Sequence, residues 1–386
     1  MLLSRGAAAV GRAALRNRQG ALIGLLLIAC VALSLGTSTF LTTANLRTVA
    51  LGGAIDLVLV AGQAMVIIAG GFDLSIGSVM GLSAVIIGLL MADGITWWLA
   101  TIVAVVVAGL CGTLNGILIA WVGVNPLIAT LGTLFAYQGI ALVVTQSATV
   151  FASGTLVNVY GQGIYGGVPT PVWIALVIII VAAAVMRWFR FGREIFFVGG
   201  NADAARLAGI AVQRVRLMTY IVMGCLAGLA GALALGRVGT ANADTGANEE
   251  LNVIAAAVIG GASLAGGEGS IVGAALGVLL IQVVEDAVVL LNVSVFWQQL
   301  VVGVVLVVAV ALNVVTAKVR DRLSVRAALA QFSALAPLRN NPQLSVSPIP
   351  LSGGGASSLA PGAGVPPPGG DERPGIKETR RKGESP

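Results

Sequence analysis

The feature that most constrains this chain is a long stretch with almost no charge. Between Thr48 and Met186 there is no lysine or arginine, and the only charged residues are Asp56, Asp73 and Asp93. Over the whole chain 57% of residues are hydrophobic and 10% are charged, whereas soluble domains carry about 25% charged residues. A soluble fold could not bury so much apolar surface, and within lipid only helices or closed barrels satisfy the backbone. We therefore predict an all-α polytopic membrane protein.

Hydropathy divides the apolar stretches into ten candidate spans. A helix needs about 20 predominantly apolar residues to cross the hydrocarbon. The candidates cover 21–41, 49–70, 77–92, 97–121, 126–146, 171–189, 217–236, 251–266, 271–291 and 296–315. The third and eighth are short, so we expect about ten transmembrane helices of which some are tilted, broken or re-entrant.

The positions of the basic residues predict the orientation, because cations favour the cytoplasmic side. Arginine or lysine clusters in the arm 1–20, in the central loop 186–217 and in the segment 317–336. The linkers 147–171 and 239–250 carry no basic residue and fit the outer side. Six predicted spans separate the first two basic regions and four separate the second from the third, so all three can be cytoplasmic.

The same pattern predicts the domain organisation. A basic cytoplasmic arm, 1–20, precedes a transmembrane domain, 21–316, and a basic cytoplasmic segment, 317–336, follows it. From 337 to 386 the sequence is rich in Pro, Gly and Ser. Such a composition cannot bury enough apolar surface to fold by itself, so we expect a disordered C-terminal tail.

The sequence offers little material for catalysis or for binding a metal, a nucleotide or a nucleic acid. It has no histidine, and its three cysteines are scattered through apolar segments. No lysine follows a glycine, as a P-loop requires, and the cations are not clustered as nucleic-acid binding would need. We therefore predict no catalytic residue, no metal ligand, no cofactor and no nucleic-acid partner, and a membrane enzyme or scaffold is the least favoured hypothesis.

Two glycine-rich turns join predicted spans on the inner side. The first covers Gly70–Ser78, in which Asp73 and Ser75 can cap the helix that follows. The second covers Ile259–Ser270 and also begins with Gly-Gly and ends with Gly-Ser. The first turn is either a simple capped break or a lining of a solute path, and the likeness of the second turn to it suggests an internal duplication of the kind found in transporters.

The central loop contains a short predicted helix, 202–208. Asn201 can cap its start, Asp203 suits the positive end of the helix dipole, and Gly209 suits its end. On these residues alone the helix is either a solvated loop helix or a compact knob for a partner protein.

Four stretches of sequence together resemble a known family. They are Gly70–Val79, Asn125–Thr133, Gly199–Ile210, and Gly260–Gly273 followed by Phe296–Gln299. In this order they resemble the membrane subunits of ribose-, xylose- and galactose-type ABC importers, within the branched-chain amino-acid permease superfamily. The resemblance covers roughly residues 40–315.

The resemblance implies a transport subunit that binds no ATP itself and is not an enzyme. Two permease copies, expected as a homodimer, would form the path for a sugar or sugar-like solute in a bacterial inner (plasma) membrane, with both termini cytoplasmic. A periplasmic or lipoprotein solute-binding protein would deliver the solute, and a separate ATPase with two cassettes would drive transport. The central loop would then be the ATPase-coupling helix, with Asn201, Ala204, Ala205, Arg206 and Gly209 as its contacts.

Polar side chains inside the spans are candidates for the translocation path. We single out five of them, because such groups can bind solute hydroxyls, although they can equally bind one another across helices. They are Asp73, Ser75, Asn115, Asn125 and Gln138.

One residue keeps a second hypothesis open. Asp56 lies in the second span without a nearby cation, where the resemblance leads us to expect a small or apolar residue. A buried carboxyl should face a cavity, find a partner or stay protonated. The alternative function is a proton-coupled secondary transporter of a small polar solute. The solute itself, whether pentose, hexose, sugar-like signal or another polar molecule, cannot be read from the sequence.

Overall fold

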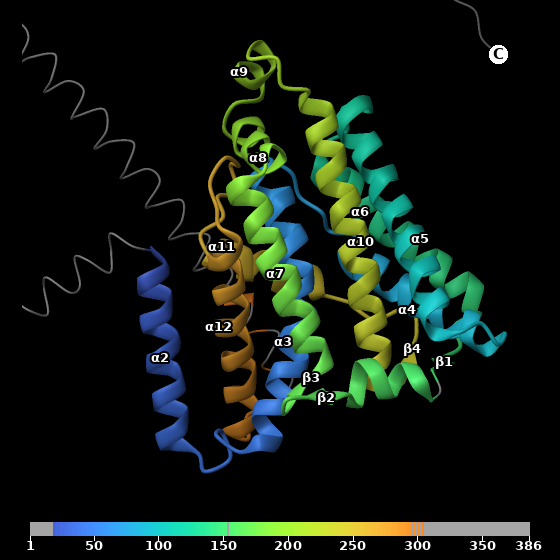
Figure 1. The fold of residues 1–386 in the computed structure, drawn as a ribbon, viewed down its shortest axis with the longest axis vertical. Coiled ribbons are helices and arrows are strands. Elements are labelled where there is room, and N and C mark those ends of the chain that lie inside the picture. Colours follow the sequence, from blue (N-terminus) through green and yellow to red (C-terminus); the bar gives the residue numbers. More distant parts are fainter. Residues whose placement is uncertain (1–17, 153, 295–296, 298–299, 301–302, 305–386) are drawn as a thin grey trace, which may run out of the picture. The chain divides into compact units, whose positions relative to one another are not determined.

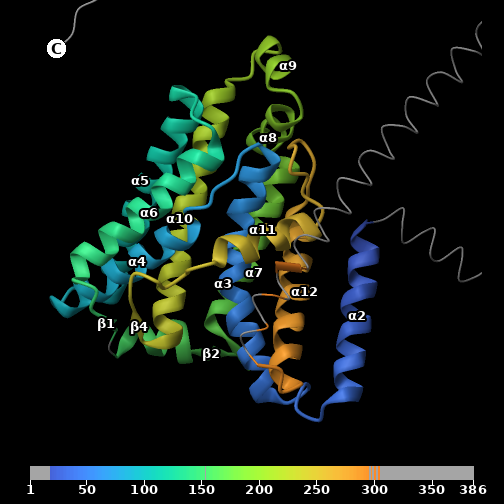
Figure 2. The same ribbon diagram turned by 180° about the vertical axis from the view of Figure 1, so that it is seen from behind.

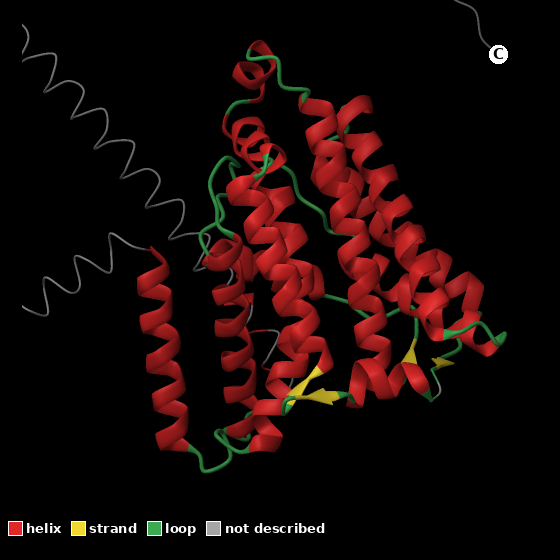
Figure 3. Cartoon of the chain, in the orientation of Figure 1, coloured by secondary structure: helices red, strands yellow, loops and turns green. Residues whose placement is uncertain are grey.

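The computed structural model describes residues 18–152, 154–294, 297, 300, 303 and 304 of the 386. Helices dominate this part of the chain, and four two-residue strands accompany them (Figures 1 and 3). The helices are α2 Arg18–Gly36, α3 Thr43–Ile68, α4 Ile76–Ala92, α5 Trp97–Ile117, η1 Leu118–Val122, α6 Pro126–Thr145, η2 Val157–Gln162, α7 Thr170–Trp188, α8 Arg190–Gly200, α9 Ala202–Leu207, α10 Val212–Val238, α11 Glu249–Ile259 and α12 Ile271–Leu290. The strands are β1 Val150–Phe151, β2 Ile164–Tyr165, β3 Val168–Pro169 and β4 Thr240–Ala241.

Seven helices within the described residues are long and apolar enough to cross a membrane. They are α2, α3, α5 with its π-helical end η1, α6, α7, α10 and α12. The prediction of an all-α polytopic membrane protein is confirmed.

Two of the predicted spans are short helices. α4 has 17 residues and α11 has 11, so at 1.5 Å per residue α11 extends only about 17 Å, roughly half of the hydrocarbon thickness. These are the third and eighth spans, which were expected to be tilted, broken or re-entrant. The tenth span, 296–315, lies almost entirely outside the described residues, as do most of the arm 1–20 and all of 317–336 and 337–386.

The connections gather at two opposite ends of the helices. α8 and α9 lie at one end, and the four strands lie at the other (Figures 1 and 2). β1 pairs with β4 in antiparallel register, with Val150 opposite Ala241 and Phe151 opposite Thr240. The linkers 147–171 and 239–250 therefore meet at the end opposite the central loop, as the charge pattern requires of two linkers on one side.

Small residues set the packing of the two central helices, α3 and α10. α10 contacts α3, α4 and α5, and α3 also contacts α7, α11 and α12. Where α10 crosses α5, a Cβ added to Gly224 would overlap the carbonyl oxygen of Ala108 and lie 3.0 Å from the amide nitrogen of Gly112. Helices in lipid gain little from the hydrophobic effect, so this close backbone approach supplies the packing contacts instead.

Gly224→Val should separate α5 from α10 and lower the free energy of unfolding by about 1–3 kcal/mol, because the branched side chain has no space to enter. Gly132→Val in α6 is the matched control, since a Cβ there meets no atom within 4 Å. The thermal unfolding of both purified variants in detergent measures the difference. Equal melting temperatures for the two variants would contradict this account of the α5–α10 contact.

Candidate functional site

Three glycine-containing turns meet in backbone contact at the end of α3. The amide of Gly267 donates a hydrogen bond to the carbonyl oxygen of Ile68 at 2.9 Å. A Cβ on Gly199, near the end of α8, would overlap the same carbonyl oxygen, and a Cβ on Gly266 would lie 2.9 Å from the Cα of Gly70. We call this contact between 68–70, 199–200 and 266–267 the glycine junction. It joins α8 directly to α3 and to the turn between α11 and α12.

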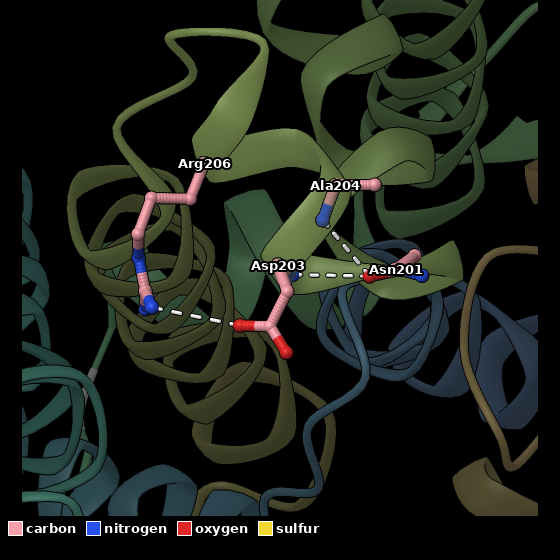
Figure 4. A network of polar contacts seen from close by, with 4 residues as sticks. All are labelled: Asn201, Asp203, Ala204 and Arg206. Carbon is pink, nitrogen blue, oxygen red and sulfur yellow. Dashed lines mark hydrogen bonds and ion pairs between the residues drawn. The ribbon is translucent and has the colours of Figure 1, made fainter. Parts of the chain in front are cut away.

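α9 projects beyond the glycine junction as a short capped helix. Figure 4 shows the Oδ1 atom of Asn201 accepting hydrogen bonds from the backbone amides of Asp203 and Ala204, at 3.1 and 2.9 Å. At the other end, Gly209 has a φ of +79°, and the next amide, of Ile210, donates to the carbonyl of Ala205 at 3.0 Å. Asn201 therefore caps the start and Gly209 ends the helix, as predicted from the sequence.

The surface of α9 is almost entirely exposed. Asn201, Ala204, Arg206 and Gly209 are exposed, whereas Ala205 is buried. Ala205 therefore anchors α9 to the rest of the protein and does not present a surface. The side chain of Leu207 is 91% exposed at the end of the helix, a position that neither hydropathy nor the capping pattern indicates.

An ion pair links Arg206 to Asp203 across one turn of α9. The Nη1–Oδ1 distance is 3.5 Å, and both side chains are largely exposed (Figure 4). Solvent screens such a pair, so its contribution to stability is small, about 0–1 kcal/mol. Both charges remain available to a partner surface.

Three of the five candidate path residues form one buried hydrogen-bond network. The backbone amide and the hydroxyl of Ser75 both donate to the Oδ1 of Asp73, at 2.9 and 2.7 Å. The side-chain amide of Asn115 donates to the Ser75 hydroxyl at 2.8 Å, and the hydroxyl of Tyr137 lies 3.3 Å from the Asn115 Oδ1. Asp73, Ser75 and Asn115 are all buried. In this conformation their hydrogen bonds, together with Tyr137, hold the loop between α3 and α4 against α5 and α6.

Hydrogen bonds compensate for the burial of the break. Burial removes the Asp73 carboxyl from water, and the two hydrogen bonds from Ser75 replace part of that lost solvation. The hydroxyl of Tyr220 on α10 donates to the carbonyl of Phe72 at 2.8 Å. These side chains supply hydrogen-bond partners to a loop that lies between two apolar helices.

The other two candidates lie elsewhere. Asn125 is exposed at the start of α6, where its Oδ1 accepts a hydrogen bond from the amide of Leu127 at 2.9 Å. It lines a cavity of about 240 Å³ together with Gly70 and Arg216. Gln138 donates to the Oδ1 of Asp244 at 2.8 Å, in the linker that follows β4. The five residues therefore do not form one site.

Sequence reasoning missed the two tyrosines of this region. Tyr137 and Tyr220 are buried, and their hydroxyls reach acceptors far away in the sequence. Both occur in apolar spans, where a buried tyrosine hydroxyl needs a partner. That signal marks them as polar contacts without saying which segment they contact.

Comparison with known proteins decides the family. A family model described as the permease component of the branched-chain amino acid transport system matches residues 45–310. The ribose import permease of Bacillus subtilis is 35% identical over 303 residues, covering 77% of this chain and 92% of that protein. The chain belongs to this permease family.

Other relatives carry related names. The D-allose transport system permease of Escherichia coli K12 is 33% identical over 299 residues, covering 77% of this chain and 91% of that protein. The autoinducer 2 import permease of Salmonella typhi is 31% identical over 284 residues, covering 73% of this chain and 82% of that protein. No solved structure matches the chain.

The chain is thus the permease subunit of an ABC importer, and the comparisons favour this function over a proton-coupled secondary transporter. The resemblance seen in four sequence stretches is confirmed. In the permease, the break at 69–75 and the glycine junction are both held by contacts between segments distant in sequence, so they are parts of the folded domain and not isolated motifs.

Asn115→Ala in the permease should lower the free energy of unfolding by about 1–3 kcal/mol, because it removes two buried hydrogen bonds, one to the hydroxyl of Ser75 and one from the hydroxyl of Tyr137. Gln138→Ala removes a side-chain amide from a partly exposed pair and should change stability by less than about 0.5 kcal/mol. Denaturation of the purified variants measures both effects. A larger loss for Gln138→Ala than for Asn115→Ala would show that the network does not hold the break.

Proposed function

We propose that this permease conducts a sugar or sugar-like solute and is driven through α9 by a separate ATPase with two cassettes. The observation that carries the proposal is the geometry of α9. It is an exposed, capped helix whose neighbour, α8, is in backbone contact with the end of α3. A helix held in this way can receive a push from a partner and pass it to the transmembrane helices.

The glycine junction provides the mechanical connection. The backbone of Gly199 on α8 lies so close to the carbonyl oxygen of Ile68 that a Cβ would overlap it. The amide of Gly267 donates a hydrogen bond to the same oxygen. Because backbone atoms touch without intervening side chains, displacement of α8 must move α3 and the turn between α11 and α12 together. Close-packed interiors transmit such strain instead of absorbing it.

The charge of the central loop supports cytoplasmic docking. It carries six arginines, and cations flanking transmembrane helices favour the cytoplasmic side. We infer from this that α8 and α9, together with both termini, face the cytoplasm and that the strand-bearing end faces outward. A solute-binding protein would then dock at the strand-bearing end.

The relatives supply the solute class. They are named for ribose, D-allose and autoinducer 2, and the first two of these are neutral polyhydroxylated molecules. By analogy we propose a sugar-like solute for this chain, and a second copy of the permease as the other half of the path. The homodimer and the binding protein are part of the same proposal.

If α9 docks in the ATPase, Arg206→Glu and Leu207→Glu should each abolish co-purification of the partner ATPase and ATP-dependent uptake. The first reverses a charge and the second places a carboxylate where an exposed leucine would be buried on docking. Tyr165→Glu is the matched control, since Tyr165 is an exposed apolar residue at the strand-bearing end. It should keep the ATPase bound.

Both α9 variants should insert and accumulate like the unmodified protein, because neither position is buried. Retention of the ATPase by both variants would remove α9 as the docking element. Loss of the ATPase in Tyr165→Glu as well would point to a general folding defect.

The orientation can be tested separately by labelling in intact cells. In a background without Cys30, Cys111 and Cys225, Tyr165→Cys should react with a membrane-impermeant maleimide. Asp203→Cys should react only after the membrane is permeabilised. Labelling of Asp203→Cys in sealed cells would place α9 outside and exclude ATPase docking there.

A further inference from the structure

A second cavity lies among the transmembrane helices and is not part of the coupling surface. It has a volume of about 260 Å³ and is lined by five helices and the linker before α11. Its polar lining residues are Asp56 on α3, Arg237 on α10, Thr245 in the linker, Glu249 on α11, and Gln282 and Glu285 on α12. The volume corresponds roughly to eight water molecules, which is room for one small solute. We call it the acidic cavity.

The acidic cavity lies at the depth where transporters bind their solutes. Asp56 is near the middle of the 26-residue α3, about 18–20 Å from either end. The side chain of Glu249, the first residue of α11, is hydrogen-bonded to Asp56, so the short helix begins at this depth. Transporter sites are built at the bilayer midplane from discontinuous helices of this kind.

The hydrogen-bonding groups of the acidic cavity are unbalanced. Both hydrogens of the Gln282 amide are used, because its nitrogen donates to the Oδ2 of Asp56 at 2.8 Å and to the Oε2 of Glu285 at 3.1 Å. The Oε2 of Glu249 is shielded from solvent and finds no hydrogen-bond partner among the residues that the structure describes. Among the described residues, the lining therefore leaves at least one carboxylate oxygen, the Oε2 of Glu249, without a donor.

The charges favour a neutral ligand over a cation. Asp56 and Glu249 are in hydrogen-bond contact, and two carboxyl groups so placed retain a proton between them because adjacent negative charges repel. Glu285 adds one negative charge, and Arg237 offsets one. The other carboxyl groups on these elements, those of Asp244, Glu250 and Asp286, are absent from the lining. Most of the negative charge in the cavity is therefore already balanced. The Oε2 of Glu249, by contrast, still lacks a hydrogen-bond donor.

We propose that the acidic cavity binds a small neutral polyhydroxylated solute within a single copy of the chain, its hydroxyl groups donating to Asp56 and Glu249. This inference takes its solute class from the proposed function and adds the site. Carboxylates accept pairs of neighbouring hydroxyls, and Arg237 donates to ring or hydroxyl oxygens at the rim, where it is exposed. Asp56 is then a specificity-determining residue, which accounts for a carboxyl group inside an apolar span.

The test measures thermal unfolding of the full-length permease in lipid nanodiscs with added solutes. The neutral probes are D-ribose, D-xylose, D-allose and D-galactose, and the cationic probes are D-glucosamine and ammonium chloride. At least one neutral sugar should raise the melting temperature, because a ligand that binds only the folded state stabilises it. Asp56→Asn and Glu249→Gln should each weaken that sugar's binding about tenfold or more, as expected for losing a hydrogen bond to a charged group.

Asp286→Asn is the matched control. It makes the same change on α12, one position from Glu285, but Asp286 accepts its hydrogen bond from Asn45 outside the cavity at 2.8 Å. This variant should bind the sugar as the unmodified protein does. If Asp56→Asn does not fold, the comparison of Glu249→Gln with Asp286→Asn decides the matter.

Three results would overturn the proposal: no neutral sugar raises the melting temperature, a sugar's effect survives both cavity substitutions, or only the cationic probes act. ATP-dependent uptake is measured in parallel. If uptake requires ATP but is unchanged by both cavity substitutions, the cavity is not the solute site and the proposed function stands. If the sugar binds at the cavity but its uptake does not require ATP, the proposed function is wrong and the site stands.

Discussion

The permease depends on satisfying backbone polar groups where its helices are interrupted by buried breaks. Neighbouring helices shield these breaks from water, so each free amide and carbonyl needs a partner within the protein. At the first break, the amide of Gly71 donates to Val66 and the carbonyl of Phe72 accepts from Tyr220. At the turn between α11 and α12, Gly267 donates to Ile68. Neighbouring segments thus supply hydrogen-bond partners to the interrupted backbone, so the breaks do not leave buried polar groups unsatisfied.

The order of the elements bears on the suspected internal duplication. A long helix, a break and a short helix follow one another twice: α3, 69–75 and α4, and then α10, 239–248 and α11. The two short helices meet where they begin, because a Cβ on Gly77 of α4 would overlap the carbonyl oxygen of Gly246, three residues before α11. This order favours 239–248 as the counterpart of the first glycine turn, instead of the Gly-Gly sequence at 259–270. The likeness of the two glycine turns reflects their shared packing in the glycine junction.

The sequence predicted the features that depend on local pattern. Hydropathy located the spans and the two short helices, and Asn201 with Gly209 located both ends of α9, because caps act within a few residues of chain. It could not predict which residues meet across helices. Asp73, Ser75 and Asn115 were chosen as path residues from polarity, yet they bind one another, whereas Gln138 contacts Asp244. Ala205 was expected at the coupling surface but is buried, because the side of a six-residue helix that faces the protein depends on how α8 approaches α3.

One helix connects the acidic cavity directly with the glycine junction. From Asp56, α3 continues for about 18 Å to Ile68, whose carbonyl lies in the junction. From Glu249, α11 extends about 17 Å to Ile259, and the turn that follows it leads to Gly266 and Gly267. Under the proposed docking, a displacement applied at α9 would reach Asp56 through α3 and Glu249 through that turn and α11. α12 begins four residues after Gly267 and packs against both α3 and α11. Gln282 and Glu285 on α12 therefore share the connection that links Asp56 and Glu249 to the glycine junction. The lining of the cavity and the surface proposed for docking thus belong to one continuous set of packed helices.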